Sequence, residues 1–198
     1  QCMMAKLTGF EAINSSLYDR ATAIFEAITC AIRVKRKTSI ALVSEGIYPG
    51  DKDVLETQIA DTETVIEWIP TNQETGLTDA EALKELLNKH GDKVATVVFP
   101  QTNNLGLLED VDTLTDICSN AKVIITAVVD PMLLATGGLK PPAEFGKDPS
   151  GLGEQMGIDG ISAYNVGVLY VEDKKPVRIM KGQYGPYTVS YTHLPLPT

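Results

Sequence analysis

The chain has 198 residues, of which 43% are hydrophobic and 22% are charged, which is ordinary for a soluble globular protein. Its formal net charge of −9 argues against binding to nucleic acid or to an anionic membrane surface. No apolar run approaches transmembrane length and no signal peptide is visible, so we expect no membrane among its partners.

Helical and strand-like patterns alternate along the chain. The opening "QCMMAKLTGF" reads like the middle of a helix. Apolar residues then recur at helical spacing from Leu17 to Val34, with Asn14, Ser15 and Ser16 as candidate caps. The later predicted elements, in order, are a strand over 38–44, a helix over 51–60, a strand over 64–70, a helix opened by a capping box from Thr78 to Glu81 and ended near Gly91, a strand over 94–99, a helix carrying Val111 to Cys118, a strand over 122–129, a Gly/Pro-rich loop over 136–160 and a strand over 166–172.

Strands separated by helices of this length predict right-handed crossovers and a mainly parallel sheet with helices on both faces. The strands are nearly continuous apolar runs, which is typical of burial on both sides. We therefore predict the α/β class, as a three-layer sandwich without internal repeats.

Metal chemistry finds no support in the residue spacing. The three cysteines form no CxxC pair, so they are interpreted as reduced and mostly buried thiols. Two histidines, His90 and His193, are too few for a histidine metal site or a convincing catalytic triad. We predict no metal site.

Three polar segments should meet beyond the carboxyl ends of the strands, where such sheets bind ligands. The first precedes a helix and offers Ser15 and Ser16, which suit a phosphate but also suit plain capping. Asp19 in the same segment would repel a phosphate. The second, residues 99–110, is rich in amides, which would suit a ring or a carboxylate, or form a simple turn. The third is Asp130, which either caps a turn with Pro131 or holds a protonated heterocyclic nitrogen.

These three segments together resemble the large domain of fold-type I pyridoxal-phosphate enzymes, in which an aspartate pairs with the pyridinium nitrogen. Such an enzyme also needs a lysine for the internal aldimine, about 25 to 30 residues beyond that aspartate. No lysine lies between Lys147 and Lys174, and Lys140 and Lys147 come too early in the chain. The Schiff-base lysine is missing.

Three stretches carry a more specific resemblance: "LTGFEAINSSLYDRATAIFEA", "NNLGLLEDVDTL" and "VVDPMLLATGGLKPPAEFGKD". They resemble the glycine cleavage system P-protein, glycine dehydrogenase (decarboxylating), and within it subunit 1 or the N-terminal half of fused forms. The likeness runs from residue 1 to about 172. It implies the fold-type I architecture without the cofactor lysine, which subunit 2 or the C-terminal half carries.

The resemblance also implies a reaction and partners. The family decarboxylates glycine on pyridoxal phosphate and passes the aminomethyl group to the lipoyl arm of H-protein. It implies a heterotetramer with subunit 2, in the bacterial cytoplasm or in the mitochondrion of a eukaryote. No catalytic residue is then expected in this chain, and Ser15, Ser16 and Asp130 would be vestigial or weak cofactor contacts.

Some residues depart from the family pattern. Arg20 stands where relatives tend to have glycine, and we interpret it as an exposed helix arginine. "PSGLGEQMG" after Asp148 has little strand propensity. We expect residues 1–188 to be part of a large domain, an internal fragment of a longer protein, and residues 189–198 to be a non-native tail. Two other hypotheses stay open: a stand-alone enzyme of the aminotransferase or desulfurase kind, and a non-catalytic scaffold subunit.

Overall fold

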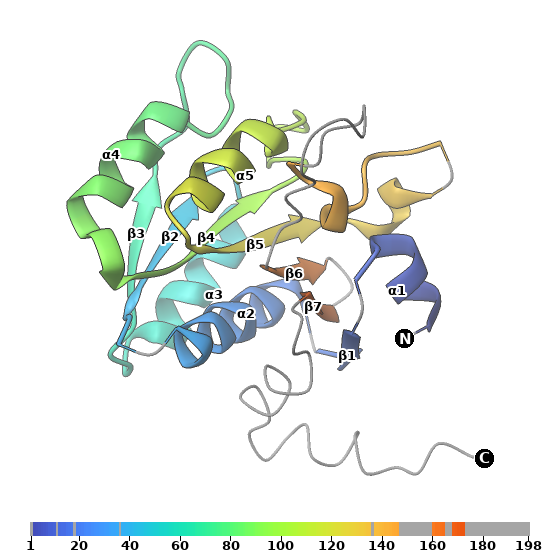
Figure 1. Ribbon diagram of the computed structural model, residues 1–198, viewed down its shortest axis with the longest axis horizontal. Coiled ribbons are helices and arrows are strands. Elements are labelled where there is room, and N and C mark those ends of the chain that lie inside the picture. The colour runs from blue at the N-terminus through green and yellow to red at the C-terminus, as the bar shows by residue number, and fades with distance from the viewer. Residues whose placement is uncertain are drawn as a thin grey trace.

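A computed structural model describes residues 2–10, 12–17, 19–35, 37–135, 137–146, 160–164 and 168–172, within which one mixed sheet is covered by helices (Figure 1). The helices are α1 (Cys2–Thr8), α2 (Arg20–Val34), α3 (Pro49–Ile59), α4 (Ala80–His90) and α5 (Val111–Asn120), with 3-10 turns η1 (Gly91–Lys93), η2 (Pro131–Leu134) and η3 (Pro142–Glu144). The strands are β1 (Ala12–Ser16), β2 (Ile40–Ser44), β3 (Val65–Ile69), β4 (Val94–Pro100), β5 (Ile124–Val129), β6 (Gly160–Tyr164) and β7 (Val168–Glu172).

The sheet has the strand order β1-β7-β6-β5-β4-β2-β3. The pairs from β3 to β6 are all parallel, as the alternation of strands and helices predicts. β7 runs antiparallel to β6 and to β1, so the edge that carries the N-terminal strand is antiparallel. The mainly parallel α/β sheet of the sequence prediction is confirmed.

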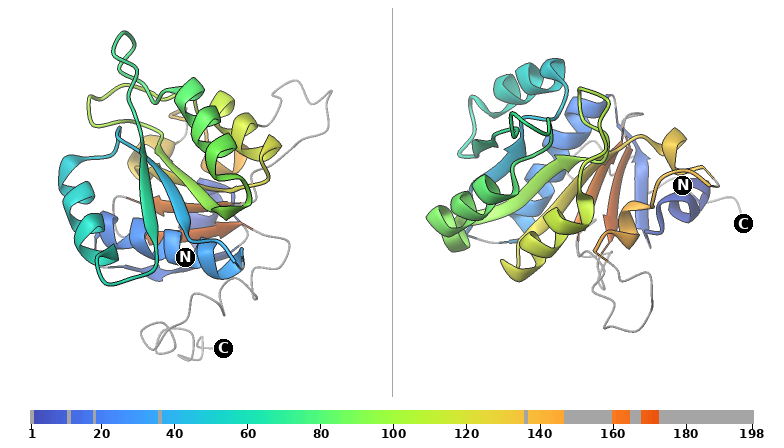
Figure 2. Two further views of the ribbon diagram at one scale, coloured as in Figure 1. Left: turned by 90° about the vertical axis from the view of Figure 1, so that its left-hand side faces the viewer. Right: turned by 90° about the horizontal axis from the view of Figure 1, so that it is seen from above.

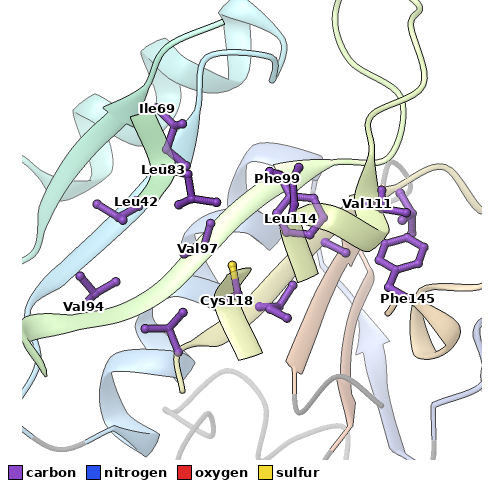
Figure 3. Close-up of a cluster of buried hydrophobic side chains, with 14 of the residues drawn as sticks. Leu42, Ile69, Leu83, Val94, Val97, Phe99, Val111, Leu114, Cys118 and Phe145 are labelled. Carbon is purple, nitrogen blue, oxygen red and sulfur yellow. The ribbon is translucent and has the colours of Figure 1, made fainter. Parts of the chain in front are cut away.

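Helices cover both faces of the sheet, which completes the three layers (Figure 2). On one face, α4 and α5 pack on Leu42, Val97 and Phe99, and the loop residue Phe145 extends this core toward α1 (Figure 3). On the other face, α2 and α3 pack on the strand residues of opposite parity. Because successive side chains of a strand point to opposite faces, a strand buried on both sides must be apolar throughout.

Two sequence predictions about local structure are wrong. Residues 12–16 form β1, a strand paired with β7, so Asn14, Ser15 and Ser16 do not cap the following helix, α2. The cap is Asp19, whose carboxylate accepts the backbone N–H of Thr22 at 2.7 Å. The side chains of Ser15 and Ser16 lie outside what the structure describes.

The predicted capping box at Thr78 is also wrong, because the residue that caps the helix is the next one in the chain. Asp79 caps α4 and accepts the N–H groups of Glu81 and Ala82. The hydroxyl of Thr78 is engaged elsewhere, 2.7 Å from the hydroxyl of Ser44 at the end of β2. Buried contact with the sheet therefore decides which of two neighbouring capping residues is used.

The remaining element predictions agree with the structure to within a few residues, with one omission. β6 was not expected, because its sequence "GISAY" has a glycine and a serine among its five residues. The segment of low strand propensity after Asp148 and the predicted tail over 189–198 lie outside the described residues. Within the described residues, no helix has both the length and the hydropathy needed to cross a membrane.

Candidate functional site

The loops after β2, β4 and β5 meet at the carboxyl edge of the sheet. The N–H of Gln101, just after β4, donates to the carbonyl of Val128 in β5 at 2.8 Å. Asn104 then reaches the turn after β2, where its N–H donates to the carbonyl of Gly46 at 2.8 Å. The second and third polar segments are therefore brought together as predicted.

The first polar segment joins this edge through Arg20. Its Nε atom lies 2.5 Å from Oδ2 of Asp51 in α3, and its guanidinium lies 4.2 Å from the ring centre of Tyr48. The interpretation of Arg20 as an exposed arginine is wrong, since only 21% of its side chain is exposed. Arg20 links the start of α2 to the start of α3, and Asp19 accepts the backbone N–H of Thr22 in the first turn of α2.

Asp130 follows β5 directly and caps the 3-10 turn η2. Its Oδ1 accepts the N–H of Met132 at 2.9 Å, and its carbonyl accepts the N–H of Leu133 at 3.0 Å. Pro131 is buried and starts the turn with its fixed φ. This geometry is that of a turn-forming Asp-Pro pair.

A buried carboxylate that the sequence analysis did not single out organises the same edge. Glu109 is 7% exposed and accepts two N–H groups, from the backbone of Thr78 at 2.8 Å and from Nδ2 of Asn103 at 3.0 Å. Gly46 lies against this pair, since a Cβ there would be 3.1 Å from Oε1 of Glu109. Glu109 therefore links the loop after β4 to the segment before α4. The sequence signal that could have singled out Glu109 is its place in the polar segment that follows the predicted strand over 94–99.

Lys140, the first lysine after Asp130 in the sequence, has its amine paired with a carboxylate. Nζ of Lys140 lies 2.7 Å and 3.0 Å from the two carboxylate oxygens of Asp112. Its backbone carbonyl accepts from Nε2 of Gln101 at 2.7 Å. Lys147 lies outside the described residues. No group of three or more His, Cys, Asp or Glu side chains that could hold a metal occurs in the described part of the chain.

These contacts can be tested against the chemistry of pyridoxal phosphate, which needs an amine for a Schiff base, a carboxylate for the pyridine nitrogen and donors for the phosphate. At the described positions the Lys140 amine is held by Asp112, and the Asp130 carboxylate is engaged in its own turn. The amides at the start of α2 face the negative charge of Asp19. The Lys140 amine and the amides at the start of α2 therefore do not fit the cofactor, and one carboxylate oxygen of Asp130 is used by its own turn.

Comparison with known proteins identifies the relationship. Residues 1–182 match the family model described as "Glycine cleavage system P-protein". The chain belongs to the glycine cleavage system P-protein family.

The P-protein relatives include "Probable glycine dehydrogenase (decarboxylating) subunit 1" of Nitrosospira multiformis, which is 36% identical over 162 residues. That alignment covers 80% of this chain and 35% of the relative. The chain therefore spans about a third of the length of the curated P-protein subunits that it matches.

Solved structures agree with the fold. An inhibitor-bound "glycine decarboxylase (P-protein) of the glycine cleavage system" superposes with a TM-score of 0.69 and 29% identity, over 90% of this chain and 38% of that one. The pyridoxamine-pyruvate aminotransferase of Mesorhizobium loti superposes with a TM-score of 0.57 at 15% identity, over 93% of this chain and 44% of that one. The second match concerns the fold alone, and it agrees with the predicted fold-type I architecture.

Proposed function

We propose that this chain is part of the glycine decarboxylase subunit that does not carry the cofactor lysine. The observation that carries the proposal is the family match over residues 1–182, together with 36% identity to a protein named as subunit 1. The assembled enzyme decarboxylates glycine on pyridoxal phosphate, which acts as the electron sink, and passes the aminomethyl group to the lipoyl group of H-protein.

In this proposal the Schiff-base lysine lies on the partner, which is subunit 2 or the C-terminal half of a fused protein. Two observations support that division of labour. The sequence has no lysine between Lys147 and Lys174, and Lys140 is held by Asp112. We assign no catalytic residue to this chain, whose described residues supply the packed wall to which the loops of the carboxyl edge are fixed.

Ser15, Ser16 and Asp130 are proposed to be remnants of a cofactor site. Asp130 keeps its place at the end of a buried strand because its carboxylate caps η2. Ser15 and Ser16 lie in β1, whose pairing with β7 gives the segment a structural role in the sheet. The assembly is a heterotetramer in the bacterial cytoplasm, in keeping with the bacterial relatives, or in the mitochondrion of a eukaryote.

Reconstitution tests the proposal. The subunit that contains this chain is mixed with a glycine decarboxylase subunit 2, lipoylated H-protein, pyridoxal phosphate and glycine, and the exchange of labelled bicarbonate into the glycine carboxyl group is measured. We expect exchange only when both subunits are present. A stand-alone enzyme would instead give exchange or transamination without subunit 2, and borohydride would then fix a pyridoxyl group on a lysine of this chain. That adduct would overturn the proposal.

A further inference from the structure

Residues 137–146, "GGLKPPAEFG", form a strap that joins the carboxyl end of β4 to the start of α5. Nε2 of Gln101, just after β4, donates to the carbonyl of Lys140 at 2.7 Å. Oδ1 of Asp112, in the first turn of α5, accepts the N–H of Gly146 at 2.7 Å. The strap belongs to a stretch that carries the family resemblance, and the proposed function gives it no role.

An exposed carboxylate holds the second half of the strap. Besides the N–H at the end of the strap, Asp112 binds Nζ of Lys140 at 2.7 Å and 3.0 Å, and the two side chains are 51% and 31% exposed. Within the described residues, the backbone hydrogen bonds that leave the strap come from Gly138 and Leu139, at its beginning. Ion pairs between exposed side chains are weak and are screened by salt. The polar contacts of the second half are therefore easily broken.

Two buried polar atoms beneath the strap lack a hydrogen bond. Gln101 is 5% exposed and Thr115, on α5, is 1% exposed, yet Oε1 of the first and Oγ1 of the second have no hydrogen-bond partner among the described residues. Thr115 lies directly under the end of the strap, since a Cβ on Gly146 would be 2.7 Å from its Cγ2. A buried polar atom without a partner destabilises the state that buries it, and contact with water removes this penalty. Both atoms therefore favour opening of the strap.

Apolar burial opposes opening. Phe145 is fully buried and Ala143 is 1% exposed, and Phe145 extends the core beside Val111 of α5 (Figure 3). Moving these side chains into water is unfavourable, so the open strap is a minor population. Gly137 and Gly146, with φ of +81° and +69°, stand at the two ends of the strap. Glycine tolerates the backbone changes that a hinge requires.

The loop that follows β4 differs from the strap, because its buried amide is satisfied. Asn103 is 1% exposed, and its Oδ1 accepts the N–H groups of Leu105 and Leu107, both at 3.0 Å. Its Nδ2 donates to the carbonyl of Gly76 at 2.8 Å and to Glu109 at 3.0 Å. Opening of this loop would break four hydrogen bonds of a buried side chain, whereas opening of the strap hydrates two atoms that have none.

We propose that the strap is a flap that opens locally over the carboxyl end of β4, while the loop after β4 and the helices stay folded. Parts of a native protein with few or weak contacts open separately from its core. The open strap uncovers the side chain of Gln101, at the edge where sheets of this kind bind ligands. The inference does not depend on the proposed function.

Thiol labelling tests the flap in the subunit that contains this chain. Ala143→Cys places a thiol on the buried side of the strap, in a Cys2→Ser background, and mass spectrometry of peptides follows its reaction with a disulfide reagent. Each rate is divided by the rate of the same peptide in urea. We expect the thiol introduced by Ala143→Cys to react at least about tenfold faster than Cys118, which is buried in the same core on α5.

Variants of the contacts beneath the strap should move this rate in opposite directions. Thr115→Val keeps the shape of the side chain and removes the unpaired hydroxyl, so labelling should slow at least about threefold. Asp112→Ala should speed labelling, and added salt should speed it in the parent but not in this variant. Glu85→Ala, at an exposed carboxylate on α4, is the matched control and should leave the rate unchanged.

Equal protection of the introduced thiol and Cys118 would overturn the proposal, because the strap would then open only with the core. Faster labelling in Thr115→Val would also overturn it, since the hydroxyl would then be satisfied in the closed state. If Ala143→Cys does not fold, hydrogen exchange of the unmodified subunit decides the question. Amides of residues 143–146 should exchange faster, relative to the unfolded chain, than those of residues 104–107, and equal or slower exchange would overturn the flap. None of these outcomes bears on the proposed function.

Discussion

A single carboxylate, Asp130, stands where the family resemblance puts a cofactor contact and where the structure has a turn. Its sequence context, a buried β-branched run that ends in Asp-Pro, is compatible with both roles. The structure shows the capping role, because Oδ1 of Asp130 accepts the N–H of Met132 at 2.9 Å at the start of η2. Replacing a capping side chain lowers the free energy of unfolding by an amount that can be measured.

Substitution at Asp130 separates the two roles. An asparagine caps nearly as well as an aspartate, whereas an alanine costs about 1 kcal/mol. We therefore expect Asp130→Asn in the assembled enzyme to leave glycine turnover within about twofold and stability nearly unchanged, and Asp130→Ala to lower stability by about 1 kcal/mol. Turnover and urea denaturation of both variants are the measurements. A large loss of turnover in Asp130→Asn, with the assembly intact, would show that the negative charge takes part in the reaction.

At the scale of the element, the apolar runs made β2, β4 and β5 predictable, since a strand buried on both faces has little choice of residues. β1 was not predictable in the same way. Its polar sequence "AINSS" is a strand because β7, far along the chain, pairs with it. Likewise, Thr78 and Asp79 are both good caps, and the contact of Thr78 with Ser44 decides between them. Local sequence patterns do not predict contacts between segments that are far apart in the chain.

The same limit applies to the candidate site. The sequence placed three polar segments at the carboxyl edge, and the bond from Gln101 to Val128, two residues before Asp130, joins the second segment to the third. It did not reveal that Arg20 would pair with Asp51, or that Glu109 would be buried. Both depend on which loops lie side by side, which follows from the strand order.

One contact between elements is sensitive to pH. Nε2 of His90, at the end of α4, lies 2.8 Å from Oε2 of Glu67 in β3. The close approach of the His90 imidazole, and then the hydrogen bonds from Lys89, lower the pKa of Glu67 below its usual value of 4.5. A carboxyl whose pKa is lower in the folded state stabilises the fold above its unfolded pKa. This stabilisation is lost as the pH falls through the folded pKa.

We therefore expect the fold to lose stability from this contact as the pH falls below 4.5, and His90→Gln to lose less over the same range. Glutamine keeps a donor but cannot carry the charge. Urea midpoints of both proteins, at neutral pH and below 4.5, measure the difference. Lys84→Gln, which removes a salt bridge of α4 with Glu81 at 2.7 Å, is the matched control. Equal losses in wild type and His90→Gln would contradict the role of this contact.

At the scale of the whole molecule, two cysteines report on the two helical layers. Cys30 is buried in α2 and Cys118 in α5, on opposite faces of the sheet, whereas Cys2 is exposed. Burial raises the pKa of Cys30 to about 12 and also raises the pKa of Cys118. Only the thiolate reacts quickly with disulfide reagents, so both buried thiols should be inert in the folded chain.

Because both layers pack on the same strands, neither should open without the other. We expect Cys30 and Cys118 to react with a disulfide reagent at one shared rate, at least about a thousandfold slower than Cys2, as the marginal stability of a domain of this size allows. Mass spectrometry of peptides labelled over time measures each thiol, and Cys2→Ser removes the fast phase. Rapid labelling of Cys30 while Cys118 stays protected would mean that the layer of α2 and α3 opens alone. The sheet would then not act as a shared core.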